Sequence, residues 1–213
     1  MPDALAPRAT DALIIVDPQN DFCPGGSLAV ADGDAIMAGI AELSTRFAHV
    51  VVTQDWHPAG HSSFASSHPG AAPFSVITMP YGEQVLWPDH CIQGSAGADF
   101  HPAVAPAVAR ARLILRKGSD SRIDSYSAFR ENDRTTRTGL AGHLRDIGVE
   151  RCVLVGLAYD FCVGWSALDA VDNGFAARVV SDLSRAIAMP TGAGRTSVDD
   201  IQDRFRTAGV VLI

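Results

Sequence analysis

The sequence predicts an α/β fold: a three-layer sandwich with a mostly parallel, roughly six-stranded, Rossmann-like sheet flanked by helices. Six short apolar runs rich in β-branched residues recur along the 213 residues, and amphipathic stretches lie between several of them. Most of these runs are apolar throughout and do not alternate with polar residues, which is typical of strands covered on both faces. Strand and helix patterns that alternate along the chain indicate a parallel sheet with crossover helices.

The six expected strands are short segments with the length of buried strands. They cover residues 12–17, 49–55, 112–117, 151–158, 177–182 and 209–213. We expect their carboxyl ends to meet at one edge of the sheet, because parallel strands all end on the same side.

Three helices are expected between these strands, over 33–48, 135–148 and roughly 160–172. In the first two, apolar residues stand three or four positions apart, as on the buried face of a helix: Ile36, Ile40, Leu43 and Phe47, then Leu140, Leu144 and Ile147. Gly148 follows the second of these helices, at the position that C-cap glycines prefer.

Length and composition favour one domain over residues 1–213, because a chain of this length can bury a full core. The formal net charge of −7 gives no basic footprint for nucleic acid. The apolar runs are far shorter than the ~18 residues of a membrane span. The first residues show no secretory signal, and four cysteines are too few for a disulfide scaffold. We therefore expect a cytoplasmic protein with reduced thiols and no membrane or nucleic-acid partner. A homo-oligomer is an alternative that the sequence leaves open.

Residues 56–106 form the longest stretch without clear periodicity, rich in Gly, Pro, Ser and His. Long irregular segments in compact domains are usually functional. We therefore expect this stretch to be a loop region that binds a metal and a substrate.

Chemically capable side chains stand at the ends of the first four expected strands. Asp17, Asp55 and Lys117 end the first three strands, and Cys162 follows the fourth by a short turn. In open α/β sheets the ligand crevice lies beyond the carboxyl ends of the strands. We therefore expect these four groups to converge there.

The stretch VTQDWHPAGHSSF, residues 52–64, indicates a metal site. Asp55 and His57 are two positions apart at a strand end, so an extended backbone directs both to the same side. His61 follows in the next turn and is a further candidate ligand. Carboxylate and imidazole together suit zinc, iron(II) or manganese(II), and without a thiolate the donor set does not choose among them.

A third ligand is expected from LWPDHCIQGSAGADFHP, residues 86–102, where His90 and Cys91 compete for the role. His90 would give a mixed oxygen and nitrogen site with open positions, which is typical of catalytic metal sites. The remaining histidines are interpreted as surface or structural residues: His49, His68, His101 and His143.

Cys162 is the preferred candidate nucleophile, since it opens the third expected helix. Backbone N–H groups and the positive end of the helix dipole favour a thiolate there, and the same amides could stabilise an oxyanion. Lys117 could lower the pKa of the thiol, and Asp17 could accept its proton. Cys23 is a rival without a helix start after it, and Cys152 lies inside an apolar strand as a core residue.

Five segments, which span almost the whole chain in order, resemble the nicotinamidases of the isochorismatase-like, or cysteine hydrolase, superfamily. They are LIIVDPQNDFCPGGSLAV (13–30), VVTQDWHPAGHSSFAS (51–66), WPDHCIQGSAGADFHP (87–102), RKGSDSRIDSYSAF (116–129) and VGLAYDFCVGWSALDAVDNGF (155–175). The metal segment and WPDHC are the part of the match that is typical of nicotinamidases, because many relatives in the superfamily lack a metal.

The resemblance implies an isochorismatase-like fold and roles for particular residues. The family's Asp-Lys-Cys triad falls on Asp17, Lys117 and Cys162. Its metal ligands, for one divalent ion per chain (Zn, Fe or Mn), fall on Asp55, His57 and His90, and a further histidine that some members use falls on His61.

The same resemblance implies an oxyanion hole and a substrate pocket. The oxyanion hole includes a non-proline cis peptide, expected at Leu157–Ala158, with the amides of Ala158 and Cys162. Aromatic residues that flank the substrate ring fall on Phe22 and Trp87, and Tyr126 has a similar place in the pocket. One departure is Tyr159, where many members have Thr, and its side chain either alters the pocket wall or packs outward.

The implied activity is hydrolysis of nicotinamide to nicotinate and ammonia through a cysteine thioester, as in NAD salvage, and often of pyrazinamide too. Two alternatives stay open. A related cysteine amidase would act on carbamoyl or ureido substrates, although the metal residues argue against it. A non-catalytic zinc-binding module would keep its binding after thiol alkylation, whereas an enzyme would lose all turnover.

Overall fold

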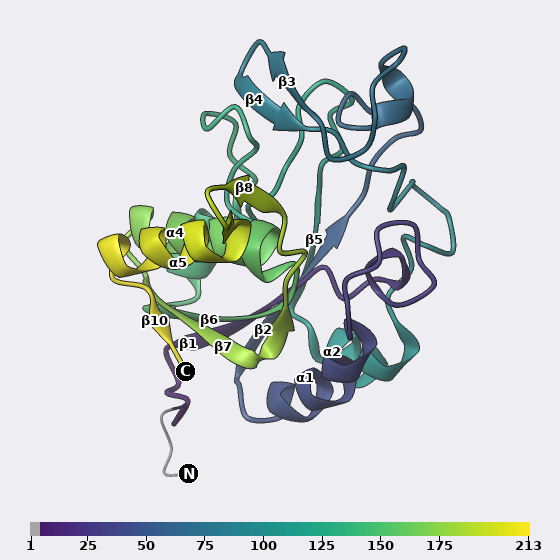
Figure 1. Ribbon diagram of the computed structural model, residues 1–213. Coiled ribbons are helices and arrows are strands. Elements are labelled where there is room, and N and C mark those ends of the chain that lie inside the picture. Colours follow the sequence, from purple (N-terminus) through teal and green to yellow (C-terminus); the bar gives the residue numbers. More distant parts are fainter. Residues whose placement is uncertain (1–4) are drawn as a thin grey trace.

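The computed structural model describes residues 5–213 and is built on a six-stranded sheet in which all neighbouring strands run parallel (Figure 1). The strands are β1 (Asp11–Val16), β2 (His49–Asp55), β5 (Leu113–Lys117), β6 (Arg151–Leu157), β7 (Ala176–Arg185) and β10 (Val211–Leu212), in the order β10-β7-β6-β1-β2-β5. All six expected strands are present, so the predicted α/β fold is confirmed.

The middle strands are apolar throughout because both faces of the sheet are covered. Every residue of β1 and β6 is buried, as are the last six of the seven residues of β2. The edge strand β5 instead alternates, with Ile114 45% exposed. The register pairs Asp55 with Lys117, so the last residues of β2 and β5 lie side by side at the carboxyl edge.

Helices cover the two faces of the sheet in pairs (Figure 1). One face carries α1 (Met37–Ser44) and α2 (Ala105–Arg110), and the other carries α4 (Gly164–Asp172) and α5 (Ser197–Ala208). The first helix is shorter than the predicted 33–48: it follows a 3-10 turn, Asp34–Ile36, and ends at Ser44. The hydroxyls of Ser44 and Thr45 donate to the carbonyls of Ala41 and Glu42, and such local bonds compete with a further helical turn.

The helix before β6, α3 (Leu140–Asp146), is also shorter than its prediction of 135–148. Its first predicted turn is a loop, because the Asp133 carboxylate accepts the backbone N–H groups of Thr135 and Thr136. Gly148 has a φ of +76° and donates to the carbonyl of Arg145, which confirms the predicted C-cap glycine.

The third predicted helix, 160–172, begins as a π-helical turn, Tyr159–Val163, before α4 starts at Gly164. A glycine is needed there because a Cβ atom would stand 2.5 Å from Ile201 of α5. The helix α5 itself was not predicted, although Thr196 and Asp199 form a capping box at its start.

The segment 56–106 is largely irregular, as predicted, but contains a hairpin of β3 (Val76–Met79) and β4 (Gly82–Val85). Short 3-10 turns at Asn20–Phe22, Ala65–Ser67 and Pro102–Val104 and a second small hairpin, β8 (Pro190–Gly192) with β9 (Arg195–Thr196), complete the elements. Within residues 5–213, no helix has both the length and the apolar character that crossing a membrane requires.

Candidate active site

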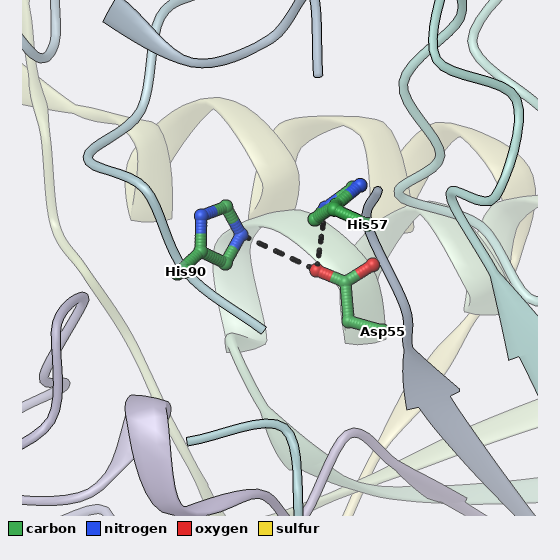
Figure 2. Close-up of side chains that lie close together, drawn as sticks. All are labelled: Asp55, His57 and His90. Atoms are coloured by element: carbon green, nitrogen blue, oxygen red, sulfur yellow. Dashed lines mark hydrogen bonds and ion pairs between the residues drawn. The ribbon is translucent and has the colours of Figure 1, made fainter. Parts of the chain in front are cut away.

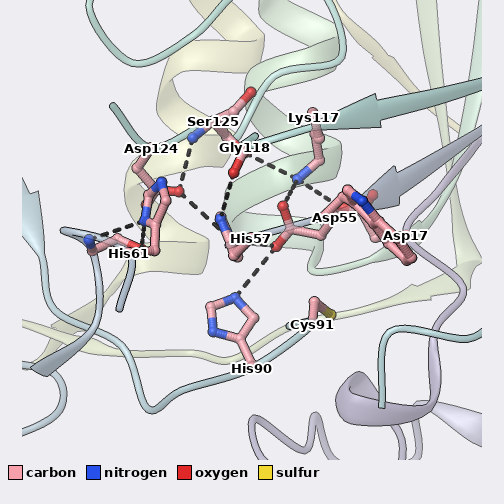
Figure 3. Close-up of polar contacts among 12 residues, drawn as sticks. Asp17, Asp55, His57, His61, His90, Cys91, Lys117, Gly118, Asp124 and Ser125 are labelled. Atoms are coloured by element: carbon pink, nitrogen blue, oxygen red, sulfur yellow. Dashed lines mark hydrogen bonds and ion pairs between the residues drawn. The ribbon is translucent and has the colours of Figure 1, made fainter. Parts of the chain in front are cut away.

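Lys117 ends β5 at the carboxyl edge of the sheet, and its fully buried side chain contacts the other candidate catalytic groups (Figure 3). Its Nζ lies 2.8 Å from Asp17 Oδ2, 3.0 Å from Asp55 Oδ1 and 3.5 Å from Cys162 Sγ, and donates to the Ser125 carbonyl. Burial lowers the pKa of the ammonium, but the charges of Asp17 and Asp55 outweigh it and hold that pKa well above its usual range. The structure thus brings together the four groups predicted to converge here. Lys117 is also the only lysine in the sequence.

Asp17 follows β1 in a left-handed backbone conformation, with a φ of +45°. Its Oδ1 accepts a 2.6 Å hydrogen bond from the Thr53 hydroxyl on β2. Burial raises the pKa of Asp17, and the Lys117 ammonium lowers it by less. Asp17 is therefore a stronger base than an exposed aspartate, which suits a residue that accepts a proton.

Cys162 lies in the π-helical turn after β6 and is only 8% exposed. Burial raises the pKa of its thiol well above the usual value; Lys117 opposes the rise, and Asp17, Asp55 and Asp124 add to it. The protein's own groups therefore keep the thiol protonated at neutral pH. That the backbone amides of this turn favour a thiolate stays a prediction; burial and three carboxylates oppose it, and the Lys117 ammonium supports it.

Asp55, His57 and His90 form a cluster of possible metal ligands (Figure 2). Asp55 Oδ2 lies 3.0 Å from His57 Nε2 and 3.3 Å from His90 Nε2, and all three residues are buried. This is the one such group found among residues 5–213. The structure therefore brings together the three residues that were predicted from separate segments.

The hydrogen bonds of the two imidazoles show that a cation fits between these side chains. His57 Nδ1 lies 2.9 Å from the Gly118 carbonyl, and His90 Nδ1 lies 2.8 Å from the Pro88 carbonyl. A carbonyl only accepts, so each Nδ1 carries the hydrogen and each neutral Nε2 turns a lone pair toward Asp55. Lone pairs that face a carboxylate need a proton or a metal between them, and this backbone support is typical of metal-binding histidines.

The electrostatics of this cluster favour a bound cation. Burial lowers the pKa of His57, but the adjacent Asp55 carboxylate raises it more. For Asp55, burial raises the pKa, but His57 and Lys117 hold it well below its usual range. Asp55 therefore stays ionised and faces the metal cluster with one oxygen and Lys117 with the other.

His61 lies beside this cluster, with its ring centroid 4.4 Å from that of His57. Its Nε2 lies 2.8 Å from the Asp120 carbonyl and so donates, while its Nδ1 accepts the backbone N–H of Ser63 at 3.1 Å. Both ring nitrogens are thus used by the protein. His61 therefore packs against His57 and is not part of the three-residue cluster.

None of the other three cysteines belongs to the metal cluster or lines the cavity. Cys91 is buried behind His90, and its amide donates to Asp21 Oδ2 at 2.7 Å. Burial raises the pKa of Cys91 well above its usual value, raises that of Cys23 to about 11 and raises that of Cys152 to about 12. All four cysteines are free.

An aromatic cavity connects the metal cluster to the thiol. Its lining consists of Phe22, Leu28, Asp55, Trp87, His90, Asp124, Ser125, Tyr126, Ala158, Phe161, Cys162 and Ile187. The Trp87 and Phe161 rings are perpendicular, with centroids 4.9 Å apart, and Tyr126 packs 5.5 Å from Phe161. The cavity therefore has aromatic walls, with Cys162 in one part of its lining and Asp55 and His90 of the metal cluster in another.

The turn before Cys162 has the expected cis peptide bond between Leu157 and Ala158. Ala158 lines the cavity, whereas Leu157 is not among the lining residues. The departure at Tyr159 leaves the pocket wall unchanged, because this side chain packs outward against Phe205 of α5, with ring centroids 5.9 Å apart.

Several residues of the site have no clear signal in the sequence. Asp160 accepts the amides of Ile187 and Ala188 at 3.0 and 2.8 Å and the hydroxyl of Ser197 at 2.5 Å. These bonds hold Ile187 in the cavity wall. Asp160 and Ile187 are far apart in the chain, so no local sequence pattern indicates this contact. Phe161 could have been predicted as a site residue, because it directly precedes Cys162 in the sequence.

The chain is similar in sequence to known hydrolases. The family model described as "Isochorismatase domain" matches residues 11–208. A nicotinamidase of Acinetobacter baylyi is 53% identical over 84% of this chain and 82% of its own length. One from Escherichia coli is 41% identical over 83% of each chain.

Solved structures give the same grouping. A nicotinamidase/pyrazinamidase structure from Acinetobacter baumanii has a TM-score of 0.92 and 48% identity, covering 97% of this chain and 96% of that one. A Leishmania infantum (L. infantum) structure in complex with nicotinate has a TM-score of 0.80 and 41% identity, covering 96% and 92%. A Pyrococcus horikoshii pyrazinamidase in complex with zinc has a TM-score of 0.71 and 30% identity, covering 96% and 98%. By sequence and by fold, this chain belongs to the isochorismatase family.

Proposed function

We propose that this protein is a nicotinamidase that hydrolyses nicotinamide to nicotinate and ammonia and also accepts pyrazinamide. The observation that carries the proposal is the single aromatic cavity, which has Cys162 in one part of its lining and Asp55 and His90 of the metal cluster in another. A substrate with an aromatic ring nitrogen and a carboxamide would meet both. Relatives named nicotinamidase, at 53% and 41% identity, support this reading.

The covalent step falls to Cys162 and Asp17. Asp17 accepts the thiol proton as the sulfur forms a bond to the carboxamide carbon, and the carbonyl oxygen becomes an oxyanion near the amides of Ala158 and Cys162. Asp17 then returns the proton to the nitrogen, and the C–N bond breaks to release ammonia. A water that gives its proton to Asp17 attacks the thioester, and nicotinate leaves as the thiol reforms.

Lys117 stabilises both partners of this proton transfer. Its ammonium lies 2.8 Å from the Asp17 carboxylate and 3.5 Å from the sulfur, so its charge favours either anion as the proton moves. The raised pKa of the thiol means that the proton leaves only when Asp17 accepts it.

Asp55, His57 and His90 would hold one divalent cation, zinc, iron or manganese. A cation held there supplies a Lewis acid to which the ring nitrogen of the substrate can bind. The zinc complex of the Pyrococcus horikoshii relative supports a metal in this family. Phe22, Trp87 and Tyr126 then orient the ring from the cavity walls, so that its carboxamide faces Cys162.

Two other activities are weaker alternatives. A cysteine amidase for carbamoyl or ureido substrates would not use the buried metal cluster to bind a ring nitrogen of its substrate. A zinc-binding module would not need a thiol, an ammonium and a carboxylate in contact within a cavity. Four free cysteines support a cytoplasmic location, where reduced thiols persist.

The test is ammonia release by the purified protein from nicotinamide, pyrazinamide, a carbamoyl amino acid and a ureido compound, each with and without added zinc, iron(II) or manganese(II). We expect turnover of the two aromatic amides alone, with activity restored by metal after chelation. Turnover of the carbamoyl substrate alone would favour the related amidase, and no turnover of any amide with metal retained would favour the module.

A further inference from the structure

Asp124 is a buried carboxylate in the cavity that belongs neither to the Asp17, Lys117 and Cys162 group nor to the metal cluster (Figure 3). It is 2% exposed and lies in the long connection between β5 and α3. Buried carboxylates are rare unless they are paired or hold a cation. Its position therefore needs an explanation.

The contacts of Asp124 orient it toward the metal cluster. Its Oδ1 accepts the backbone N–H of Ser125 at 2.8 Å and lies 3.9 Å from His57 Nε2, the same nitrogen that faces Asp55. Its Oδ2 accepts a 2.7 Å hydrogen bond from Gln84 Nε2. Two carboxylates thus face one imidazole nitrogen, but Asp124 is not among the three residues whose ligand atoms all lie within 4.8 Å of one another.

The formal charges around the cavity point to the same conclusion. With neutral imidazoles and a neutral thiol, the cavity lining together with Lys117 and its partner Asp17 carries three carboxylates, Asp17, Asp55 and Asp124, and one ammonium. Their sum is −2, which one divalent cation balances. Without the charge of Asp124, the same cation would leave the buried site with a net positive charge, and uncompensated buried charge is costly.

Gln84, on the β3–β4 hairpin, fixes the Asp124 carboxylate in this position. Its side chain is 1% exposed, and the second hydrogen of its Nε2 is donated to the Val85 carbonyl at 2.7 Å. Its Oε1 accepts the Tyr81 hydroxyl at 3.1 Å. Because both ends of the amide are engaged, Gln84 cannot turn away without losing several hydrogen bonds.

We propose that Asp124 is a positioning residue of the metal site, whose carboxylate raises the affinity for a divalent cation without being one of its direct ligands, and that Gln84 holds it there. The inference rests on the metal site of the proposed function. Nearby carboxylates that act in this way typically change metal affinity by about 10–100-fold.

The test is competition between the metal-free protein and a chromophoric chelator for zinc. We expect Asp124→Asn to bind zinc about 10–100-fold more weakly than wild type. The matched control is Asp89→Asn, which removes the same charge from an exposed residue next to His90 in the chain and should leave zinc affinity unchanged. His90→Ala, which loses a direct ligand, should bind zinc more weakly than Asp124→Asn.

Each outcome decides a separate statement. If wild type binds no zinc, the metal site of the proposed function is wrong. If wild type binds zinc and Asp124→Asn binds it equally well, only the present inference is overturned. Zinc binding as weak in Asp124→Asn as in His90→Ala would make Asp124 a direct ligand, which also overturns it.

A second variant keeps the test decisive if Asp124→Asn does not fold, which thermal unfolding with excess chelator would show. Gln84→Met keeps the Asp124 carboxylate but removes the amide that holds it. We expect a severalfold weaker affinity for zinc in this variant, smaller than the effect of losing the carboxylate. Unchanged affinity in Gln84→Met would contradict the role given to the hairpin.

Discussion

Lys117 joins two sets of side chains that serve different parts of the proposed reaction. Asp17 and Cys162, which exchange the proton, contact its ammonium on one side, and Asp55 of the metal cluster contacts it on another. The sequence predicted the first set of contacts. It predicted that Asp55 would lie near this group but not that Asp55 would pair directly with Lys117, because the pairing depends on the register of β2 against β5.

At this scale the first prediction concerns the nucleophile. Cys162→Ala should lower turnover of nicotinamide on the order of 10⁶-fold, because no other group can form the thioester. Fold and metal content should be unchanged, measured by thermal unfolding and elemental analysis. Cys23→Ala should remain active, since Cys23 is not among the residues that line the cavity. The reverse pattern of activities would identify Cys23 as the nucleophile.

The second prediction uses the opposite charges of Lys117 and Asp17. Lys117 lowers the pKa of the Cys162 thiol and Asp17 raises it. The pH profile for alkylation of Cys162 by iodoacetamide should therefore move to higher pH in Lys117→Met and to lower pH in Asp17→Asn. Mass spectrometry of the Cys162 peptide separates this thiol from the other three.

Activity gives the complementary measurement for this pair of variants. Asp17→Asn should lose about 10²–10⁴-fold in turnover, the usual value of general acid–base help, even though its thiol ionises more readily. Profiles that overlay that of the wild type in both variants would show that neither residue acts on the sulfur electrostatically.

At the scale of elements, the strand ends were predictable and the connections were not. Buried parallel strands are continuous apolar runs, so the ends of β1 and β2 could be predicted from the sequence, at Asp17 and Asp55. The site residues that were missed lie in the connections, such as Asp124 and Ile187. Their positions are set by contacts between segments far apart in the chain, and no periodicity records such contacts.

Helices also show where predictions from sequence patterns fail. The helix α5 buries only Ser197, Ile201 and Phe205, so its apolar face is too narrow to stand out from its charged residues. The start of α4 was misplaced because a π-helical turn precedes it. That turn cannot be distinguished from an α-helix by spacing alone, and π-turns are frequent at functional sites.

The third prediction concerns the loop that Asp160 holds against the π-helical turn. Asp160→Asn should destabilise the fold by about 1–3 kcal/mol, because an amide cannot accept all the donors that the carboxylate accepts. The KM for nicotinamide should rise, since Ile187 is no longer fixed in the cavity wall. Asp182→Asn, at an exposed residue of β7, is the control and should change neither unfolding nor KM. An unchanged KM in Asp160→Asn would separate this loop from substrate binding.

At the scale of the whole molecule, a metal ion would add a further link between the end of β2 and the segment that carries His90, which backbone hydrogen bonds already hold together. Asp55 ends β2, while His57 and His90 come from two parts of the segment 56–106. A bound ion that does not bind the unfolded chain should stabilise the fold, by about 2.7 kcal/mol at a free concentration 100 times its Kd.

The fourth prediction is therefore that excess chelator lowers the melting temperature of the protein. For a domain of this size, about 2.7 kcal/mol corresponds to roughly 5–11 °C. Differential scanning calorimetry with and without chelator measures the shift, and His90→Ala should show little shift under the same conditions. A wild-type protein that melts at the same temperature in both buffers would contradict the role of the metal as a link between these loops.

The burial of the only lysine also determines how the protein reacts with amine-directed reagents. Acylating or crosslinking agents find no side-chain amine on the surface of the folded molecule, so the α-amino group of the chain is left as the site of attachment. Coupling to a solid support would then proceed without touching the reaction centre. Mass spectrometry of the intact protein would show a second acyl group only after the cavity has opened far enough to admit the reagent. The rate of acylation of Lys117 would therefore measure the rate of local unfolding of the active site.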